Sequence, residues 1–193
     1  MDLRHHWQLQ LMTSSLAAAT ALTAISINRL ILKRETVKLC GAIQSLPNLK
    51  SLEFDSVPLT KGDALSLTRL TGLTSLSVTN CSTVFDDVAA VAVCFHLRNL
   101  RKLRIASQGL AGVGLLYPVA MGIKELQSLT MSGRSSCCVD ECCVGMLASL
   151  TKLTQLSLPG SADVLAVAVQ GLRRAVPTLT AVCITPPPVQ ASV

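Results

Sequence analysis

The chain has 193 residues, enough for one domain with a sizeable core, and half of them are hydrophobic although only 3% are aromatic. Because so few aromatic side chains are present, Leu, Val and Ala must fill the core, which favours many thin, similar layers over one irregular core. The net charge is +6, and since no long basic block with interleaved aromatic residues occurs, the composition argues against a nucleic-acid-binding protein.

Residues 1–21 come first, and we interpret them as an N-terminal extension or an incomplete cap. Residues 5–28 contain no Asp, Glu, Lys or Arg, so a targeting peptide and a membrane span are both alternatives for this part of the chain. Several hydroxyl side chains make the stretch polar for a lipid core, among them Thr13, Ser14, Ser15 and Thr20. We therefore expect no membrane span, and the targeting peptide stays open.

From residue 22 onwards one pattern recurs, Leu-x-x-Leu-x-Leu with aliphatic substitutes. Its middle position recurs at intervals of 24 to 27 residues, a regularity typical of repeat architectures. The seven matches are Leu22-Ile25-Ile27, Leu49-Leu52-Phe54, Leu73-Leu76-Val78, Leu100-Leu103-Ile105, Leu126-Leu129-Met131, Leu153-Leu156-Leu158 and Leu179-Val182-Ile184.

Each match predicts a short strand whose central leucine or substitute is buried, because the two residues of Leu-x-Leu point to the same face of an extended segment. About 20 residues remain for each return path, enough for a loop and a helix of two to three turns. Right-handed crossovers then stack the strands into one parallel sheet. We expect this α/β solenoid to span residues 22–185, and residues 186–193 to form a Pro-rich tail.

Four return paths carry helix-start signals, since acidic residues favour the N-terminal end of a helix. These signals are Gly62-Asp63, Asp86-Asp87, Asp140-Glu141 and Asp163. The return path 109–123 differs, because it contains Gly109, Gly112, Gly114, Pro118 and Gly122. We expect its helix to be short or irregular.

These repeats resemble the ribonuclease-inhibitor-like leucine-rich-repeat proteins, whose repeats run strand–loop–helix in 24 to 29 residues. The resemblance covers about residues 22–185 and implies a curved parallel sheet inside and helices outside, in about seven repeats. In that family an Asn or Cys three residues after the last strand leucine bonds the loop backbone of a neighbouring repeat. Cys81 matches this position, whereas the other repeats carry Leu30, Val57, Gln108, Arg134, Ser161 and Pro187 there.

Four of the eight cysteines crowd into one segment, as Cys137, Cys138, Cys142 and Cys143. Cys138 and Cys142 are spaced to share one helix face and could begin a zinc site. A structural site needs four ligands, however, and no second cluster or nearby His is evident. We therefore predict no metal and no cofactor, and interpret the inward cysteines as small apolar residues; metal or redox chemistry is the alternative. Scattered single cysteines elsewhere fit a reducing compartment.

Other chemical signatures are weak. Gly109, Gly112 and Gly114 match neither the dinucleotide fingerprint nor a P-loop, and we interpret them as a junction loop. His5, His6 and His96 accompany no nucleophile signature and no paired-carboxylate motif. We therefore expect neither an enzyme nor a small-molecule substrate.

The residues between and beside the strand leucines should form the concave face of the sheet, where repeat proteins bind partners. Acidic residues gather in the second repeat and basic residues in the fourth, so an acidic partner segment would be attracted to the fourth. The candidate partner-binding residues are Glu53, Asp55, Ser77, Thr79, Lys102, Arg104, Thr130 and Ser157.

The predicted function is a non-enzymatic protein–protein interaction module in the cytoplasm, with a protein partner and neither nucleic acid nor membrane. Family-level uses include an adaptor of ubiquitin ligases and a component of cytoskeletal assemblies such as the ciliary axoneme. The alternatives are a metal- or redox-active protein using the Cys137–Cys143 cluster and a truncated repeat copy without independent function.

Overall fold

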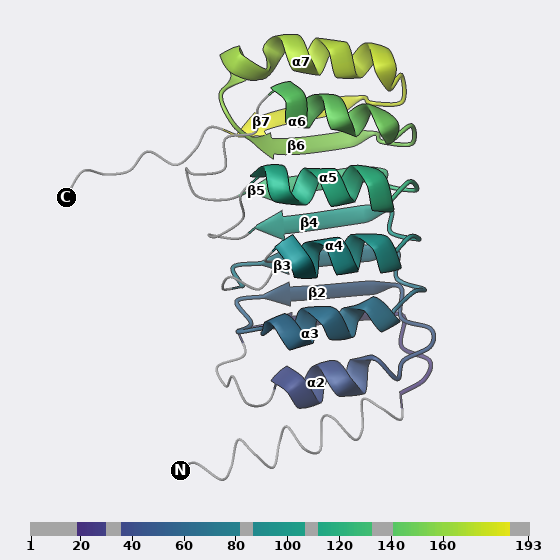
Figure 1. The fold of residues 1–193 in the computed structure, drawn as a ribbon. Coiled ribbons are helices and arrows are strands. Elements are labelled where there is room, and N and C mark those ends of the chain that lie inside the picture. Colours follow the sequence, from purple (N-terminus) through teal and green to yellow (C-terminus); the bar gives the residue numbers. More distant parts are fainter. Residues whose placement is uncertain (1–18, 30–35, 82–86, 107–111, 133–140, 186–193) are drawn as a thin grey trace, which may run out of the picture.

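A computed structural model describes residues 19–29, 36–81, 87–106, 112–132 and 141–185. Seven strands form one sheet, all parallel and in chain order (Figure 1). The strands are β1 (Ala24–Asn28), β2 (Ser51–Asp55), β3 (Ser75–Thr79), β4 (Lys102–Ala106), β5 (Ser128–Ser132), β6 (Gln155–Pro159) and β7 (Ala181–Thr185). The seven predicted strands are thereby confirmed.

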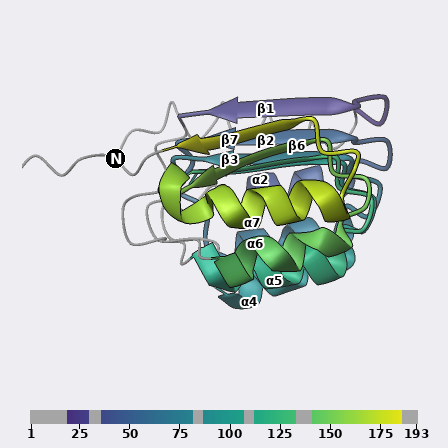
Figure 2. The same cartoon turned by 90° about the horizontal axis from the view of Figure 1, so that it is seen from above.

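One helix lies between each pair of consecutive strands, on one side of the sheet. The helices are α2 (Thr36–Ile43), α3 (Lys61–Ser66), α4 (Asp87–His96), α5 (Gly112–Gly122), α6 (Glu141–Met146) and α7 (Ala162–Ala175). The 3₁₀ turns η1 (Leu67–Arg69) and η2 (Leu147–Ser149) extend α3 and α6. In Figure 2 the terminal elements are displaced towards the sheet side, so the sheet is concave and the helical layer convex.

This arrangement is an α/β leucine-rich-repeat solenoid of seven repeats. The strand register places equivalent residues of all repeats in rows, and Leu52, Leu76, Leu103 and Leu129 lie in one row. Each of these leucines is buried, and the residue that follows it faces the opposite side of the sheet. The repeat spacing of the sequence therefore corresponds to the spatial repeat of the fold.

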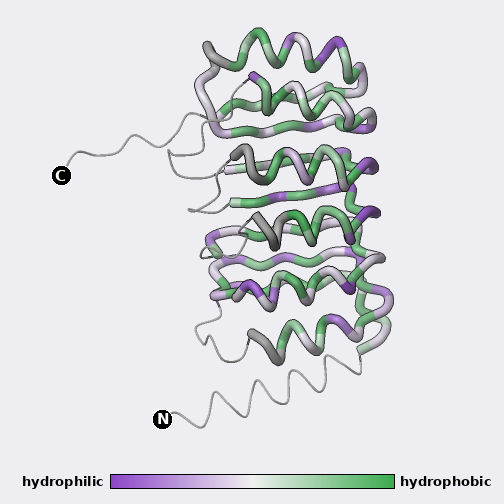
Figure 3. Tube along the Cα trace, viewed as in Figure 1, coloured by the Kyte–Doolittle hydropathy of each residue, from purple (hydrophilic) through white to green (hydrophobic). Residues whose placement is uncertain are grey.

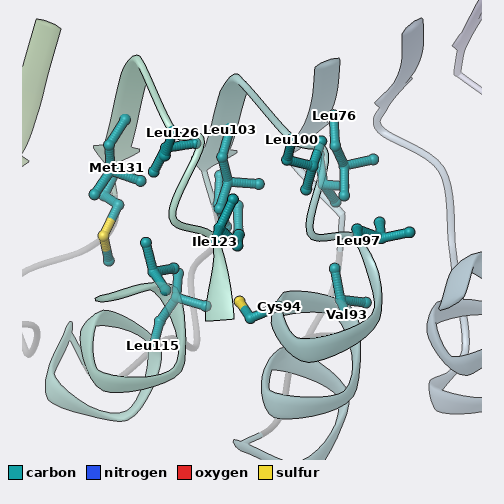
Figure 4. Close-up of a cluster of buried hydrophobic side chains, with 14 of the residues drawn as sticks. Leu76, Val93, Cys94, Leu97, Leu100, Leu103, Leu115, Ile123, Leu126 and Met131 are labelled. Carbon is teal, nitrogen blue, oxygen red and sulfur yellow. The ribbon is translucent and has the colours of Figure 1, made fainter. Parts of the chain in front are cut away.

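The core lies between the sheet and the helices, and its layers repeat from one strand to the next. Figure 4 shows Leu103 of β4 pointing towards Cys94 of α4 and Ile123, with Leu97 and Leu100 from the turn between α4 and β4 beside them. All of these side chains are at most 2% exposed. Stacked leucines thus replace the aromatic side chains that an irregular core would use.

The two end strands differ from the inner ones. Ile25 of β1 and Val182 of β7 occupy the leucine row but are only partly buried, which corrects the expectation that the whole row is buried. Each end strand has a neighbour on one side within the described residues, so part of its apolar surface stays in contact with solvent. The inner layers therefore carry most of the hydrophobic stabilisation.

The expectation for residues 109–123 is wrong in one respect, because α5 has 11 residues and is not short. Pro118 lies inside it, yet Leu115, Leu116 and Val119 are fully buried. Burial of this apolar face outweighs the low helix propensity of Gly and Pro. Gly122 is required at the end of the helix, because a Cβ there would lie 2.5 Å from the carbonyl oxygen of Cys94 in α4.

Four other helices, α3, α4, α6 and α7, follow the acidic signals closely. α4 begins at Asp87 and α6 at Glu141, whereas α7 begins one residue before Asp163. In α3 the Thr60 side chain and the Asp63 backbone form a capping box, with Asp63 Oδ2 2.7 Å from Thr60 N. α2 has no acidic residue in its first turn, and its return path was not among the four with a start signal.

A ladder of side-chain hydrogen bonds runs along the upstream ends of the strands. Asn99 Nδ2 donates to the carbonyl oxygen of Thr71 at 2.9 Å, and Thr74 Oγ1 donates to that of Lys50 at 3.0 Å. Each bond joins one repeat to the repeat before it. Asn48, Thr154, Thr178 and Thr180 make equivalent bonds. These bonds add to the backbone contacts between repeats, since the carbonyl oxygen of Lys50, for example, also accepts the backbone N–H groups of Thr74 and Ser75.

Candidate functional site on the concave face

The concave face is built from the residues that alternate with the strand leucines. In β4, Lys102 and Arg104 are exposed while Leu103 between them is buried. The register brings Arg104 beside Ser77 of β3 and Thr130 of β5, and Glu53 beside Ser77 from the other side. Glu53, Ser77, Lys102, Arg104 and Thr130 therefore lie on one surface, as alternation predicts.

Their exposure is uneven. Glu53 is exposed, and Asp55, Ser77, Thr130 and Ser157 are partly buried. Thr79 is only 8% exposed, so the expectation that it is an open contact residue is wrong. Its Oγ1 donates to Asp55 Oδ1 at 2.7 Å, and it serves the structure of the face instead.

The acidic part of the face is held by hydrogen bonds. Ser26 Oγ donates to Glu53 Oε2 at 3.0 Å, and Asn80 Nδ2 donates to Asp55 Oδ1 at 2.8 Å. The bonds from Thr79 and Asn80 lower the pKa of the Asp55 carboxyl, because they stabilise its charged form. Asp55 therefore remains a fixed negative charge at neutral pH.

A left-handed residue follows each of the first three strands. Arg29, Ser56 and Asn80 have φ values of 55°, 55° and 53°, and each N–H donates to a carbonyl oxygen of the next repeat at 2.8 to 2.9 Å. The turn directs the Asn80 side chain back to Asp55. Asn tolerates a positive φ well, so Asn80 directly after β3 was a sequence signal for this turn.

Cys81, the position that the resemblance associates with the loop backbone, is 3% exposed. Its thiol lies 3.9 Å from the carbonyl oxygen of Phe54 in the preceding repeat and 3.3 Å from that of Thr79. The expected contact between neighbouring repeats is therefore present at this position, as a long sulfur hydrogen bond. Burial is the main cause that raises the pKa of the Cys81 thiol.

A shallow groove of about 600 Å³ lies along the downstream ends of the first strands. Carboxylates line one part of it and Arg104 another, with small and amide side chains between them. Its lining residues are Asn28, Arg29, Glu53, Asp55, Thr79, Asn80, Arg104, Ala106 and Ser132. A second, smaller groove of about 370 Å³ lies over β5, β6 and β7 and includes Thr130 and Ser157.

The basic part of the face is formed by Lys102 and Arg104 of β4. Within the described residues, neither Lys102 nor Arg104 has a hydrogen-bond or ion-pair partner. Ser77 Oγ, beside Arg104 in the register, is enclosed and has no hydrogen-bond partner in the same part of the chain. Lys102 and Arg104 are accessible to a ligand, whereas the enclosed Ser77 Oγ is not, and a guanidinium can bind a carboxylate through two hydrogen bonds.

The cysteine cluster lies only partly in the described structure. Cys142 is exposed and Cys143 is buried at the start of α6, whereas Cys137 and Cys138 lie outside the described residues. The described residues contain no group of three or more His, Cys, Asp or Glu side chains that could hold a metal ion. Among other cysteines, burial raises the pKa of the Cys94 thiol to about 12, and burial together with Asp63 raises that of Cys40 to about 12. Both behave as small core residues.

The remaining sequence motifs show no catalytic arrangement in the described part of the chain. His96 ends α4, is exposed, and has its Nδ1 2.7 Å from the carbonyl oxygen of Ala92. Gly112 and Gly114 belong to α5, while Gly109 lies outside the described residues, as do His5 and His6. Across the described helices, none is both long enough and apolar enough to cross a bilayer.

Comparison with known proteins adds little to this description. No protein-family model matches the chain, and no curated protein matches it. Among solved structures, the chain is similar to an internalin from Listeria monocytogenes str. 4b F2365, with 14% sequence identity, 88% of this chain and 77% of that chain covered, and a TM-score of 0.27. At that TM-score the assignment of the fold rests on the strand register and the helical layer.

Proposed function

We propose that this chain is a non-enzymatic protein-interaction module that binds an acidic segment of a partner protein on its concave face. The observation that carries the proposal is the pair Lys102 and Arg104. Both are exposed on the central strand β4 and have no partner among the described residues. Extended, open sheet faces of this kind are the surfaces that solenoid proteins use for binding.

The acidic residues Glu53 and Asp55 lie apart from the basic pair, so the charges of the face can orient a bound segment. Glu53 lies two strands from Arg104, about 10 Å across the sheet, and Asp55 stays charged because of its hydrogen bonds. A partner carboxylate would be attracted to Arg104 and repelled by Glu53 and Asp55. Basic side chains of the same partner segment would be attracted to Glu53 and Asp55 and repelled by Arg104. Such a pattern favours one orientation of a bound segment over the other.

The wider setting is also a proposal. Repeats of 24 to 27 residues with helices along the convex side support the ribonuclease-inhibitor-like subtype, and the buried thiols of Cys40, Cys81 and Cys94 support a reducing compartment such as the cytoplasm. A protein-interaction module of this kind is sufficient for two roles. One is an adaptor of ubiquitin ligases, and the other is a component of a cytoskeletal assembly such as the axoneme.

A fluorescein-labelled peptide of about twelve residues that alternates Glu with Ser tests the proposal, since it can span the face in an extended form. We expect fluorescence anisotropy at low ionic strength to detect binding to the native chain. The double variant Lys102→Glu with Arg104→Glu should weaken binding by about tenfold or more, at an unchanged melting temperature.

The matched control reverses two charges elsewhere. Arg69→Glu with Arg174→Glu alters two exposed residues of the helical layer and changes the net charge equally. We expect this control to retain most of the binding. Equal weakening by both double variants would show a response to net charge alone and would contradict a site on the concave face.

A further inference from the structure

Four apolar side chains lie exposed on the opposite side of the molecule, on the neighbouring helices α4 and α5. They are Val91 and Phe95 of α4, exposed by 41% and 38%, and Tyr117 and Met121 of α5, exposed by 54% and 49%. We name these four residues the convex patch. The helical layer that carries them faces away from the sheet, as Figure 2 shows.

The four residues form one surface because they occupy matching positions. Val91 and Tyr117 each lie twelve residues before the central leucine of the following strand, and Phe95 and Met121 each lie eight residues before it. Gly122 packs directly against the backbone of Cys94 and Phe95, so the two helices are in close contact at this point. Phe95 and the end of α5 are therefore neighbours.

The patch is not needed to fill the core. Val93 and Cys94 of α4, and Val119 and Ala120 of α5, already supply the buried faces of the two helices. The chain has one Trp, one Tyr and three Phe, and two of these five aromatic residues are the exposed Phe95 and Tyr117. Aromatic side chains dominate the energetics of protein interfaces, and clustered exposed apolar residues mark such surfaces.

The charges around the patch are nearly all basic. Arg98 and Lys124 follow the C-terminal ends of α4 and α5, and both are exposed. Arg98 Nε donates to the carbonyl oxygen of Phe95 at 3.1 Å, and Lys124 Nζ donates to that of Ala120 at 2.6 Å, so both cations are held at the edge of the patch. Figure 3 shows hydrophobic colour along much of α4.

Acidic groups near this edge are few. α5 contains no charged residue, and α4 begins with Asp87, at the far end of the helix from Phe95. Glu125 pairs with Lys152, with its Oε2 2.6 Å from the lysine Nζ. In the described part of the two helices and the turns that follow them, the net charge beside the patch is therefore positive.

We propose that the convex patch docks an amphipathic helix of a partner protein, whose apolar face covers the four side chains and whose carboxylates lie over Arg98 and Lys124. The apolar surface supplies affinity, and the basic edge selects acidic over basic helices. A protein fits better than a lipid bilayer, because half-buried side chains of a rigid helix pair cannot reach far into the acyl region. The chain would then carry a second binding surface, separate from the concave face.

A displayed library of random peptides about 18 residues long, enough for a helix of about 27 Å, is selected on the native chain. We expect the enriched peptides to place apolar residues at helical spacing and to carry Asp or Glu beside them. Their affinity should fall at least about tenfold in Tyr117→Ser with Met121→Ser, since a few side chains, Tyr prominent among them, carry most of the binding energy of an interface.

Two controls separate the patch from other surfaces. Leu65→Ser with Val167→Ser removes two exposed apolar residues of α3 and α7 and should leave peptide binding within about twofold. Lys102→Glu with Arg104→Glu should do the same, which distinguishes this site from the concave face. If the double variant of α5 melts at a lower temperature, the single change Tyr117→Glu tests the patch instead.

Three results would overturn the proposal. One is a set of enriched peptides that bind the α5 variant as tightly as the native chain. The second is a preference for basic peptides. The third is binding of phosphatidylserine vesicles through Tyr117 and Met121 when no peptide competes, which would assign the patch to a membrane surface.

Discussion

Leu103 is the residue whose burial the repeat depends on most directly. It lies in the central strand β4, is 2% exposed, and pairs in register with Leu76 of β3 and Leu129 of β5. Leu103→Ala should lower the free energy of unfolding by about 2–5 kcal/mol, because the layer loses contacts and keeps a cavity. Urea denaturation measures this loss. Arg104→Ala, its exposed neighbour, should change stability by only about 0.5 kcal/mol or less.

Asp55 provides a test of the hydrogen bonds on the concave face. Thr79→Val and Asn80→Gly each remove a donor to its carboxylate, and Gly keeps the positive φ of residue 80 accessible. We expect both changes to raise the pKa of Asp55 towards its usual value, as followed by carboxyl carbon NMR. Because the native pKa is lowered, its contribution to stability is present above the unfolded pKa and is lost as pH falls through the folded pKa. An unchanged titration would show that the bonds are absent in solution.

The cysteines at the start of α6 have different surroundings. Cys143 is 1% exposed and packs in the core, whereas Cys142 faces solvent. We expect the reduced chain to bind less than one equivalent of zinc and Cys142→Ser to leave the melting temperature unchanged. Stoichiometric zinc, with loss of helix on adding a chelator, would contradict this, since structural metal sites couple binding to folding.

At the scale of elements, the close contact between α4 and α5 depends on one glycine. Gly122→Ala would place a Cβ 2.5 Å from the Cys94 carbonyl oxygen and force α4 and α5 apart. We expect a loss of about 1–3 kcal/mol, as for other overpacked sites. Thermal melts compared with the native chain measure it.

The matched control is Gly171→Ala in α7, where an added Cβ has no atom within 4 Å. Alanine has the higher helix propensity, so this change should stabilise the chain by about 0.4–1 kcal/mol. The same direction of change at both glycines would show that the backbone contact of Gly122 is not a constraint.

The repeat spacing predicted the strands, their parallel order and the register, because one apolar row must stack on the next to be buried. The length of α5 was predicted wrongly from its Gly and Pro residues. Burial of Leu115, Leu116 and Val119 against the core stabilises this helix, and the sequence alone does not show that these residues are buried. The ladder of Asn48 and Asn99 was also missed. Its signal is an Asn directly before the first leucine of the motif, which recurs in only two repeats.

Within the candidate site, alternation along the strands placed Glu53, Lys102 and Arg104 on one exposed face. It could not predict that Thr79 is buried, because that depends on the position of Asp55 in the neighbouring strand. The convex patch was not predicted either. Apolar residues such as Phe95 and Tyr117 read as core residues of a helix until the packing partner of each face is known.

At the scale of the whole molecule, the solenoid has two surfaces with different chemistry. The concave sheet is polar and carries separate acidic and basic parts, whereas the convex layer carries an apolar patch with a basic edge. Because the two surfaces lie on opposite sides of one thin layer of core, a change on one should leave binding at the other intact. On the two proposals together, one chain would bring two partners together.

The most direct test is quantitative affinity capture from cells with three forms of the chain as bait. These are the native chain, Lys102→Glu with Arg104→Glu, and the charge-matched control Arg69→Glu with Arg174→Glu. We predict that at least one protein with an acidic segment is captured by the native and control chains and is reduced by about tenfold or more with the concave variant. If every captured protein is retained equally by the concave variant, the concave face is not the binding site.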